Sequence, residues 1–244
     1  MPPPVLALHG FMGRGDDWAE VAALLNGEAT VFTPDLPGHG AAVGLPDAAY
    51  TLDGAADRVM AHVPPEPVVL AGYSMGGRLA LHTALRHPDR VAALVLFSAT
   101  PGLRDPESRA ARRALDTERA RSLATDLPGF LRRWYRMPLW GGMDAATRER
   151  LVARRSQNDP AELGRSLAGM GTGAMRPLWD SLSRIRAPAW AVAGATDAAY
   201  VALADAMARE GPFRVHVVPG AGHALLADAP EAVAGVLRRA LASV

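Results

Sequence analysis

Residues 68–77 of the chain read Val-Val-Leu-Ala-Gly-Tyr-Ser-Met-Gly-Gly. Within this stretch an apolar run leads into the G-x-S-x-G pattern of residues 72–76, and a helical pattern follows. A strand, a tight glycine-flanked turn and a helix together hold a serine hydroxyl exposed above the edge of a parallel sheet. The bare pattern is common by chance, but this context favours a nucleophile elbow and singles out Ser74.

On both sides of this motif, short apolar runs alternate with amphipathic segments, which is the pattern of βαβ units on a parallel sheet. The fold class is therefore α/β, with a mostly parallel central sheet flanked by helices. Strands are predicted at residues 5–8, 29–33, 68–71, 91–97, 189–194 and 215–218, and helices at residues 18–25, 51–63, 77–86, 201–210 and 230–242.

One long stretch, residues 101–180, interrupts this alternation. It has no strand-like run, is helical in pattern, and holds 15 of the 26 arginines against 10 acidic residues. Helices inserted between sheet strands predict a cap over the carboxyl edge of the sheet, where open α/β sheets bind ligands. We therefore expect residues 1–100 and 181–244 to form the core and residues 101–180 to form a helical cap, within one structural domain.

Composition and charge narrow the possible classes of protein. The 244 residues, of which 49% are hydrophobic, are enough for one large domain with a sizeable core. A formal net charge of +1 gives no electrostatic reason to expect a nucleic-acid or membrane partner. The absence of cysteine excludes disulfides, thiolate metal sites and a cysteine nucleophile. All 26 basic residues are arginine, so every cationic contact is a guanidinium suited to carboxylate or phosphate.

The amino-terminal segment has no basic start and no apolar run long enough for a signal peptide, and no later stretch approaches the length of a membrane span. We therefore expect a cytoplasmic protein. The sequence leaves its oligomeric state open.

A reactive serine needs a base, and the base needs an orienting carboxylate. His223 is the histidine that follows the last predicted strand, in a glycine-containing loop. Asp197 follows the preceding predicted strand at its carboxyl end, whereas Asp205 and Asp228 fall on or near helices and are better explained as surface or capping groups. The predicted catalytic set is Ser74, His223 and Asp197.

Two backbone N–H groups are expected to stabilise an oxyanion, because losing one such donor costs about 3 kcal/mol in the transition state. One is that of Met75 at the start of the helix after the serine. The other comes from the loop after the first strand, where we favour Phe11. His9 and His39 lie in glycine-flanked loops before the elbow, and we interpret them as structural.

Several longer stretches resemble a known family. Residues 8–11 (Leu-His-Gly-Phe), 35–40 (Asp-Leu-Pro-Gly-His-Gly) and 72–77 are similar to motifs found widely in α/β-hydrolases. Together with Arg78 and the cap, they resemble the menaquinone-pathway 2-succinyl-6-hydroxy-2,4-cyclohexadiene-1-carboxylate synthases. The similar cap motifs are residues 101–103 (Pro-Gly-Leu), 107–112 (Glu-Ser-Arg-Ala-Ala-Arg), 134–135 (Trp-Tyr) and 154–158 (Arg-Arg-Ser-Gln-Asn).

The resemblance implies an α/β-hydrolase fold and a lyase that works without a cofactor or metal on a small anionic polycarboxylate. The family eliminates pyruvate from 2-succinyl-5-enolpyruvyl-6-hydroxy-3-cyclohexene-1-carboxylate. After Asp197 the chain has Ala-Ala-Tyr, where relatives commonly carry a basic residue and Phe. Carried over by position, the resemblance implies a catalytic triad of Ser74, Asp197 and His223, substrate carboxylates bound by Arg78, Arg112 and Arg155, and a pocket lined by Tyr73 and Trp134.

The residues themselves support part of this implication. Arg78 lies four positions after Ser74, so a helix brings its side chain back toward the serine. A buried guanidinium needs an anion, and a charge-assisted bond to a carboxylate contributes about 1.5–3 kcal/mol. The sequence leaves two roles open for Ser74, a general base in the lyase or a nucleophile in a carboxylic-ester hydrolase.

Overall fold

Six strands form one sheet in the computed structural model, which describes residues 2–244. The order is β2-β1-β3-β4-β5-β6, and every neighbouring pair is parallel. The predicted α/β class and parallel sheet are therefore confirmed. The edge strand at β2 is shorter than predicted because only two of its residues pair with β1. The strands are β1 (Val5–Leu8), β2 (Val31–Phe32), β3 (Val68–Tyr73), β4 (Val91–Phe97), β5 (Ala189–Gly194) and β6 (Phe213–Val218).

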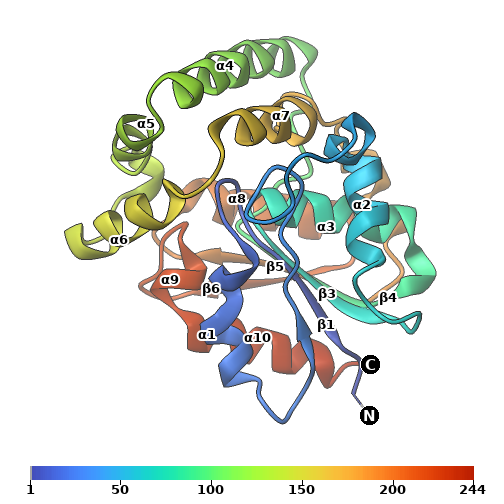
Figure 1. Cartoon of the computed structure of the whole chain (residues 1–244). Coiled ribbons are helices and arrows are strands. Elements are labelled where there is room, and N and C mark those ends of the chain that lie inside the picture. The colour runs from blue at the N-terminus through green and yellow to red at the C-terminus, as the bar shows by residue number, and fades with distance from the viewer. Residues whose placement is uncertain (1) are drawn as a thin grey trace.

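Helices cover both faces of this sheet (Figure 1). Alternate residues of β3 enter different apolar clusters: Val68 and Leu70 face one side, and Val69 and Ala71 face the other. Burial of both faces explains why the strands are continuous apolar runs. Among residues 2–244, no helix has the length and apolar character that a membrane crossing requires. The first face packs against α2 (Leu52–Met60), α3 (Met75–Arg86) and α8 (Ala198–Glu210), and the second against α1 (Ala19–Leu24) and α10 (Pro230–Leu241).

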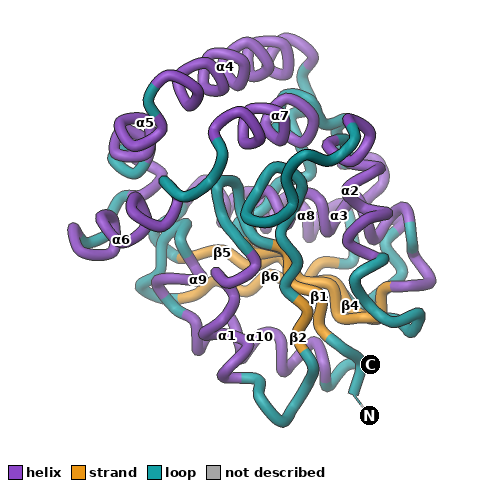
Figure 2. The backbone as a smooth tube through the Cα atoms, viewed as in Figure 1, coloured by secondary structure: helices purple, strands orange, loops and turns teal. Residues whose placement is uncertain are grey.

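The segment predicted as a cap is helical and lies above one end of the sheet (Figure 1). Loops from the carboxyl ends of the strands lie between the sheet and the cap (Figure 2). The cap has its own apolar cluster, which includes Phe130 and Leu163 and also Met12 from the core. The domain boundaries at residues 100 and 181 stay a prediction. The main cap helices are α4 (Pro106–Thr125), α5 (Leu127–Trp134), α6 (Ala145–Arg155) and α7 (Pro160–Met170).

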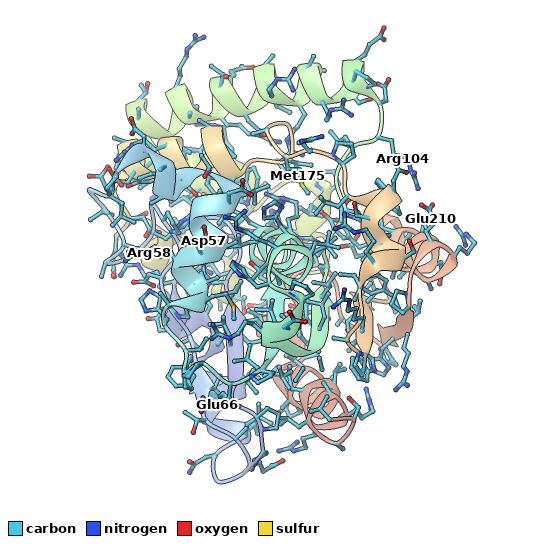
Figure 3. All side chains as sticks on the ribbon, turned by 90° about the vertical axis from the view of Figure 1, so that its right-hand side faces the viewer. Asp57, Arg58, Glu66, Arg104, Met175 and Glu210 are labelled. Carbon is cyan, nitrogen blue, oxygen red and sulfur yellow. The ribbon has the colours of Figure 1, made fainter. Side chains whose placement is uncertain are left out.

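The two ends of the cap segment are tied together where they leave the core. The backbone N–H of Leu178 donates to the carbonyl of Pro101 at 2.8 Å, and the indole of Trp179 donates to the carbonyl of Gly102 at 2.8 Å. Arg104 forms an ion pair with Glu210 at the end of α8 (Figure 3). The entry and exit of the cap are therefore held to each other and to the end of α8.

Candidate active site

Ser74 occupies a strained turn between β3 and α3. Its backbone has φ 53° and ψ −108°, a conformation that is uncommon for a residue with a side chain. A Cβ atom on Gly72 would lie 2.3 Å from the carbonyl oxygen of Gly76, and one on Gly76 would lie 2.3 Å from that of Leu8. Only glycine fits at either position, which explains the motif and the exposed place of the hydroxyl between them.

His223 and Asp197 reach this hydroxyl from the loops that follow β6 and β5. The Nδ1 atom of His223 lies 2.7 Å from Oδ2 of Asp197, and its Nε2 atom lies 3.4 Å from Oγ of Ser74. Both the imidazole and the carboxylate are buried. With Nδ1–H donating to the carboxylate, Nε2 is free to accept the serine proton, so the arrangement can make the hydroxyl basic or nucleophilic.

The structure places both predicted oxyanion segments beside the serine. Met75 is the first residue of α3, so its N–H precedes the intrahelical hydrogen bonds. A Cβ atom on Gly10 would lie 3.6 Å from the Cβ of Ser74, which puts the loop containing Phe11 against the elbow. Phe11 and Met75 line the same cavity as Ser74. Their role as donors stays a prediction.

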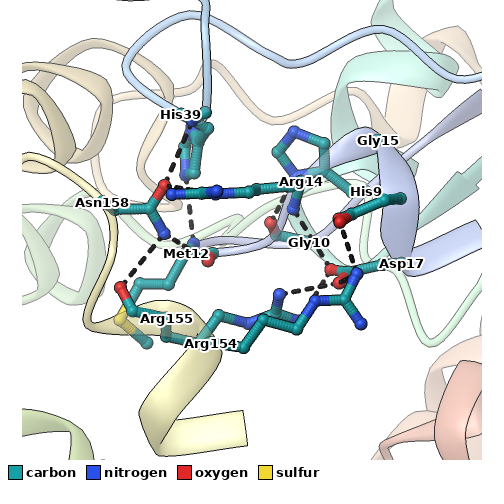
Figure 4. Close-up of polar contacts among 12 residues, drawn as sticks. His9, Gly10, Met12, Arg14, Gly15, Asp17, His39, Arg154, Arg155 and Asn158 are labelled. Atoms are coloured by element: carbon teal, nitrogen blue, oxygen red, sulfur yellow. Dashed lines mark hydrogen bonds and ion pairs between the residues drawn. The ribbon is translucent and has the colours of Figure 1, made fainter.

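His9 and His39 are structural, as predicted. Nε2 of His9 accepts the N–H of Leu36 at 3.0 Å, and Nε2 of His39 accepts the N–H of Met12 at 3.0 Å. Burial lowers the pKa of both rings, which keeps them neutral. The side-chain amide of Asn158 in the cap donates to the carbonyl of Met12 at 2.9 Å, so this loop is held from two sides (Figure 4).

A cavity of about 540 Å³ opens between the elbow and the cap, and Ser74 and His223 lie in its wall. Its size suits a small organic molecule. Arginine is the prevailing charged residue of the lining. The six are Arg78, Arg112, Arg119, Arg150, Arg154 and Arg155.

Arg78 is a buried cation without an acidic partner in the described chain, residues 2–244. Its Nη2 donates to the carbonyl of Met170 at 3.0 Å, and its Nε has no hydrogen-bond partner within the same range. Burial lowers the pKa of Arg78 to about 10, so the guanidinium is still charged at neutral pH. A desolvated charge of this kind is unfavourable until an anion binds it.

Arg112 lies on α4 and reaches the cavity from above. Its Nε donates to Oδ1 of Asp116 at 2.8 Å, and the same oxygen accepts Nη1 of Arg119 at 3.1 Å. One carboxylate therefore holds two guanidinium groups. Its other oxygen, Oδ2, is buried and finds no partner among the residues described.

Arg155 lies at the end of α6 and is bound by an acid of the core. Its Nη1 and Nη2 contact the two carboxylate oxygens of Asp17 at 2.7 and 2.6 Å (Figure 4). Burial lowers the pKa of Arg155, but Tyr135 and Asp17 raise it by more. Next to this pair, Arg154 contacts Asp16 at 2.5 Å. The contribution of Arg155 to substrate binding stays a prediction.

Aromatic rings enclose the imidazole of His223. The ring centroids of Tyr73, Trp140 and Tyr200 lie 5.7, 5.2 and 4.6 Å from it. Trp134 lines the cavity farther along, with its ring 6.2 Å from that of Phe11. Burial raises the pKa of Tyr200, so this phenol is protonated at neutral pH and can donate a hydrogen bond into the cavity.

Three residues of this site were not predicted from the sequence: Asp17, Asp116 and Arg119. The spacing of Arg112, Asp116 and Arg119 contains a usable signal, because positions four and three apart share one face of a helix. Asp17 offers no such signal. Its partner Arg155 is 138 residues away in the sequence, so their contact appears only in the folded chain.

A model described as "Alpha/beta hydrolase family" matches residues 5–236. The chain is 33% identical over 245 residues to a 2-succinyl-6-hydroxy-2,4-cyclohexadiene-1-carboxylate synthase of Klebsiella pneumoniae, covering 99% of this chain and 94% of that protein. It is also 29% identical to the chloroplastic protein PHYLLO of Arabidopsis thaliana, of which it spans 15% of the length.

Among solved structures, that of MenH from S. aureus is similar with a TM-score of 0.92 and 26% sequence identity. The match covers 99% of this chain and 94% of the other. The similarity therefore extends over the sheet and the cap together.

Proposed function

The chain belongs to the alpha/beta hydrolase family and, within it, to the 2-succinyl-6-hydroxy-2,4-cyclohexadiene-1-carboxylate synthases, and from this premise we propose that it is a pyruvate-eliminating lyase. Its substrate is 2-succinyl-5-enolpyruvyl-6-hydroxy-3-cyclohexene-1-carboxylate. The observation that carries the proposal is the buried, unpaired charge of Arg78 one helical turn from Ser74. An apolar acyl group would leave this buried charge unpaired, which is energetically costly, whereas an anionic substrate neutralises it.

In the proposed reaction Ser74 acts as a general base. The ring carbon that bears the succinyl group is next to a ketone, so its proton is acidic. The hydroxyl of Ser74, deprotonated by Nε2 of His223, removes that proton, and the resulting enolate charge develops on the ketone oxygen. We assign the stabilisation of this oxygen to the N–H groups of Phe11 and Met75.

The second half of the reaction breaks the bond between the ring and the enolpyruvyl oxygen. Electrons from the enolate re-form the ketone and move through the ring double bond, which gives the conjugated diene. The leaving oxygen takes the electron pair, and the enolpyruvate gains a proton to become pyruvate. The imidazolium of His223 is the nearest group that can return the proton it received.

The three carboxylates of this substrate match a cationic cavity. We assign Arg78, Arg112 and Arg155 to substrate binding, and Tyr73 and Trp134 to the walls around the ring. The orientation of the imidazole is assigned to Asp197 through its 2.7 Å contact. The expectation of a cytoplasmic enzyme that acts on a small polycarboxylate stays part of the proposal.

The test measures pyruvate release from enzymatically prepared substrate by the wild-type protein and by Ser74→Ala. Loss of a triad member commonly lowers kcat by roughly 10⁴-fold or more, so we expect residual activity near background. A thermal melt of each protein shows that the variant is folded.

A second arm of the same experiment tests for a carboxylic-ester hydrolase. The wild-type protein is mixed with p-nitrophenyl acetate, and the burst of nitrophenol and the mass of Ser74-containing peptides are recorded. Stoichiometric acylation of Ser74 without any pyruvate release from the cyclohexene substrate would refute the lyase and leave the esterase.

A further inference from the structure

The underside of α4 presents a charged face to the cavity. Arg112, Asp116 and Arg119 follow one another at spacings of four and three residues, which places them on one side of the helix. Their side chains are 30%, 5% and 17% exposed, whereas Arg121 on the same helix is exposed to solvent. Both Arg112 and Arg119 line the cavity that contains Ser74.

The hydrogen bonds of this face leave most of the donors of both arginines available. Each guanidinium makes a single hydrogen bond in the described part of the chain, and both bonds end on Oδ1 of Asp116. A guanidinium has five N–H donors in a planar fork that fits a carboxylate. Asp116 therefore orients the two groups without saturating either.

The charges of this part of the wall do not balance. The buried guanidinium of Arg78 faces the same cavity, and the charges of Arg78 and Arg112 interact. Among residues 2–244, Asp116 is the one carboxylate in contact with Arg112 and Arg119, and Arg78 contacts no carboxylate, so the positive charges outnumber the carboxylates that contact them. Burial and the charge of Arg112 lower the pKa of Arg119 by more than Asp116 raises it, as expected for two cations that share one carboxylate.

The indole of Trp134 packs against the guanidinium of Arg119. The Cζ atom of Arg119 lies 5.0 Å from the centroid of the Trp134 ring, within the range of a cation–π interaction. Because Trp134 also lines the cavity, a group that enters it meets the indole and the guanidinium together.

We infer that Arg119, which is not among the substrate-binding residues assigned above, completes the carboxylate subsite of Arg112, separate from the one at Arg78, so that two guanidinium groups on one face of α4 bind the same carboxylate. The role of Asp116 is to position both guanidinium groups. This inference rests on the proposed function for the identity of the substrate, but the anion site itself can be tested without it.

The first experiment measures binding of succinate by titration calorimetry, with acetate as the single-carboxylate probe. Wild-type protein is compared with Arg119→Gln and with Arg121→Gln, which removes the same charge from an exposed position of the same helix. We expect Arg119→Gln to weaken succinate binding at least tenfold and to change acetate binding less than threefold. Arg121→Gln should match the wild type for both probes.

The second experiment separates KM from kcat in pyruvate release. A residue that only binds a remote carboxylate changes KM more than kcat. We expect Arg119→Gln to raise KM at least tenfold with kcat within threefold, and Arg119→Lys to restore part of the loss because it keeps the charge. Equal melting temperatures show that the variants are folded.

The outcomes distinguish the two proposals. A wild-type protein that does not bind succinate, or an Arg119→Gln variant that binds it as tightly as the wild type, would overturn the subsite. Absence of pyruvate release with a tenfold difference in succinate binding would overturn the lyase and leave the subsite standing. A fall in kcat alone would show that Arg119 serves the reacting groups rather than a second carboxylate, and would also refute the inference.

Discussion

Two groups of arginines in the cavity wall differ in the number of carboxylates that neutralise their charge. Arg154 and Arg155 are paired with Asp16 and Asp17, and the inner pair is bidentate. Within residues 2–244, Arg112 and Arg119 share the single carboxylate of Asp116, and Arg78 forms no ion pair. The residue type and the cavity are the same, so the difference lies in the counterions.

The comparison predicts which arginines also stabilise the fold: Arg155, although assigned to substrate binding, should contribute to stability through Asp17, whereas Arg78 should not. Removing one partner of a buried ion pair strongly destabilises the folded protein, because the other partner is left as an uncompensated buried charge. A buried cation that awaits a ligand already lacks its partner, so its removal relieves the fold and weakens binding. Removing one partner of a buried pair should therefore lower the free energy of unfolding. Removing the unpaired cation should raise the free energy of unfolding and lower activity.

The largest expected effect is on the paired group. Asp17→Asn should lower the free energy of unfolding by about 3–5 kcal/mol at pH 7, since it leaves Arg155 buried without its carboxylate. Urea unfolding at equilibrium measures the difference. Removal of both charges, Asp17→Asn with Arg155→Met, should recover most of the loss. Equal destabilisation by the single and double variants would contradict a pairing role.

The pH dependence of that loss has a definite sign. Burial raises the pKa of Asp17, but the charge of Arg155, its hydrogen bonds and the charge of Arg154 together lower it by more, so the folded-state pKa lies below the ordinary value of 3.8. A carboxyl group with a depressed pKa stabilises the fold above its unfolded-state pKa and loses this contribution as the pH falls through the folded-state value. The difference between wild type and Asp17→Asn should be constant from pH 7 to pH 5 and shrink only below about pH 4.

The next effect concerns the unpaired group. Arg78→Met keeps most of the side-chain volume and removes the charge. We expect kcat/KM for pyruvate release to fall about 100-fold, which corresponds to one charge-assisted hydrogen-bonding contact. The melting temperature should rise by about 2–4 °C for each kcal/mol of relieved desolvation. An Arg78→Met variant that is both inactive and less stable than the wild type would show that Arg78 stabilises the fold, and would contradict this prediction.

The smallest effect is predicted for the rim of the paired group. Arg154 is 34% and Asp16 is 62% exposed in the side chain, so solvent screens their contact. Arg154 also lies 3.3 Å from Oδ1 of Asp17, but Arg155 already neutralises that carboxylate with two shorter contacts. Arg154→Gln should change the unfolding free energy by at most about 1 kcal/mol and leave kcat/KM within threefold. A change as large as that of Asp17→Asn would show that exposure does not decide the strength of these pairs.

The fold was predictable because its information is local. The apolar runs at β1, β4 and β5 have the boundaries predicted from sequence, and the glycines around Ser74 mark the elbow. The boundaries of β2 were not predictable, since an edge strand ends where its single neighbour stops pairing. The order of Asp197 and His223 along the chain was enough to bring them to the serine, because both follow parallel strands that end at one edge.

The charge balance of the cavity was not predictable in the same way. Arg78, Arg112 and Arg155 were given one role from the resemblance, although their counterions differ. The contact of Arg155 with Asp17 joins the last residue of α6 to the short 3-10 helix Gly15–Trp18, which precedes α1. No periodic pattern within either segment encodes it. Arg119 was within reach of the sequence analysis, since its spacing from Arg112 is helical.

Met12 links the chemistry to the cap. Its side chain completes the apolar cluster of the cap, its N–H is held by His39, and its carbonyl is held by Asn158. The adjacent residue, Phe11, is assigned to the oxyanion. A cap transplanted from another hydrolase would therefore change the side chains that contact Met12 and shift the N–H of Phe11, the proposed oxyanion donor. In this fold, the cap that binds the substrate and the loop beside Ser74 cannot be exchanged independently of each other.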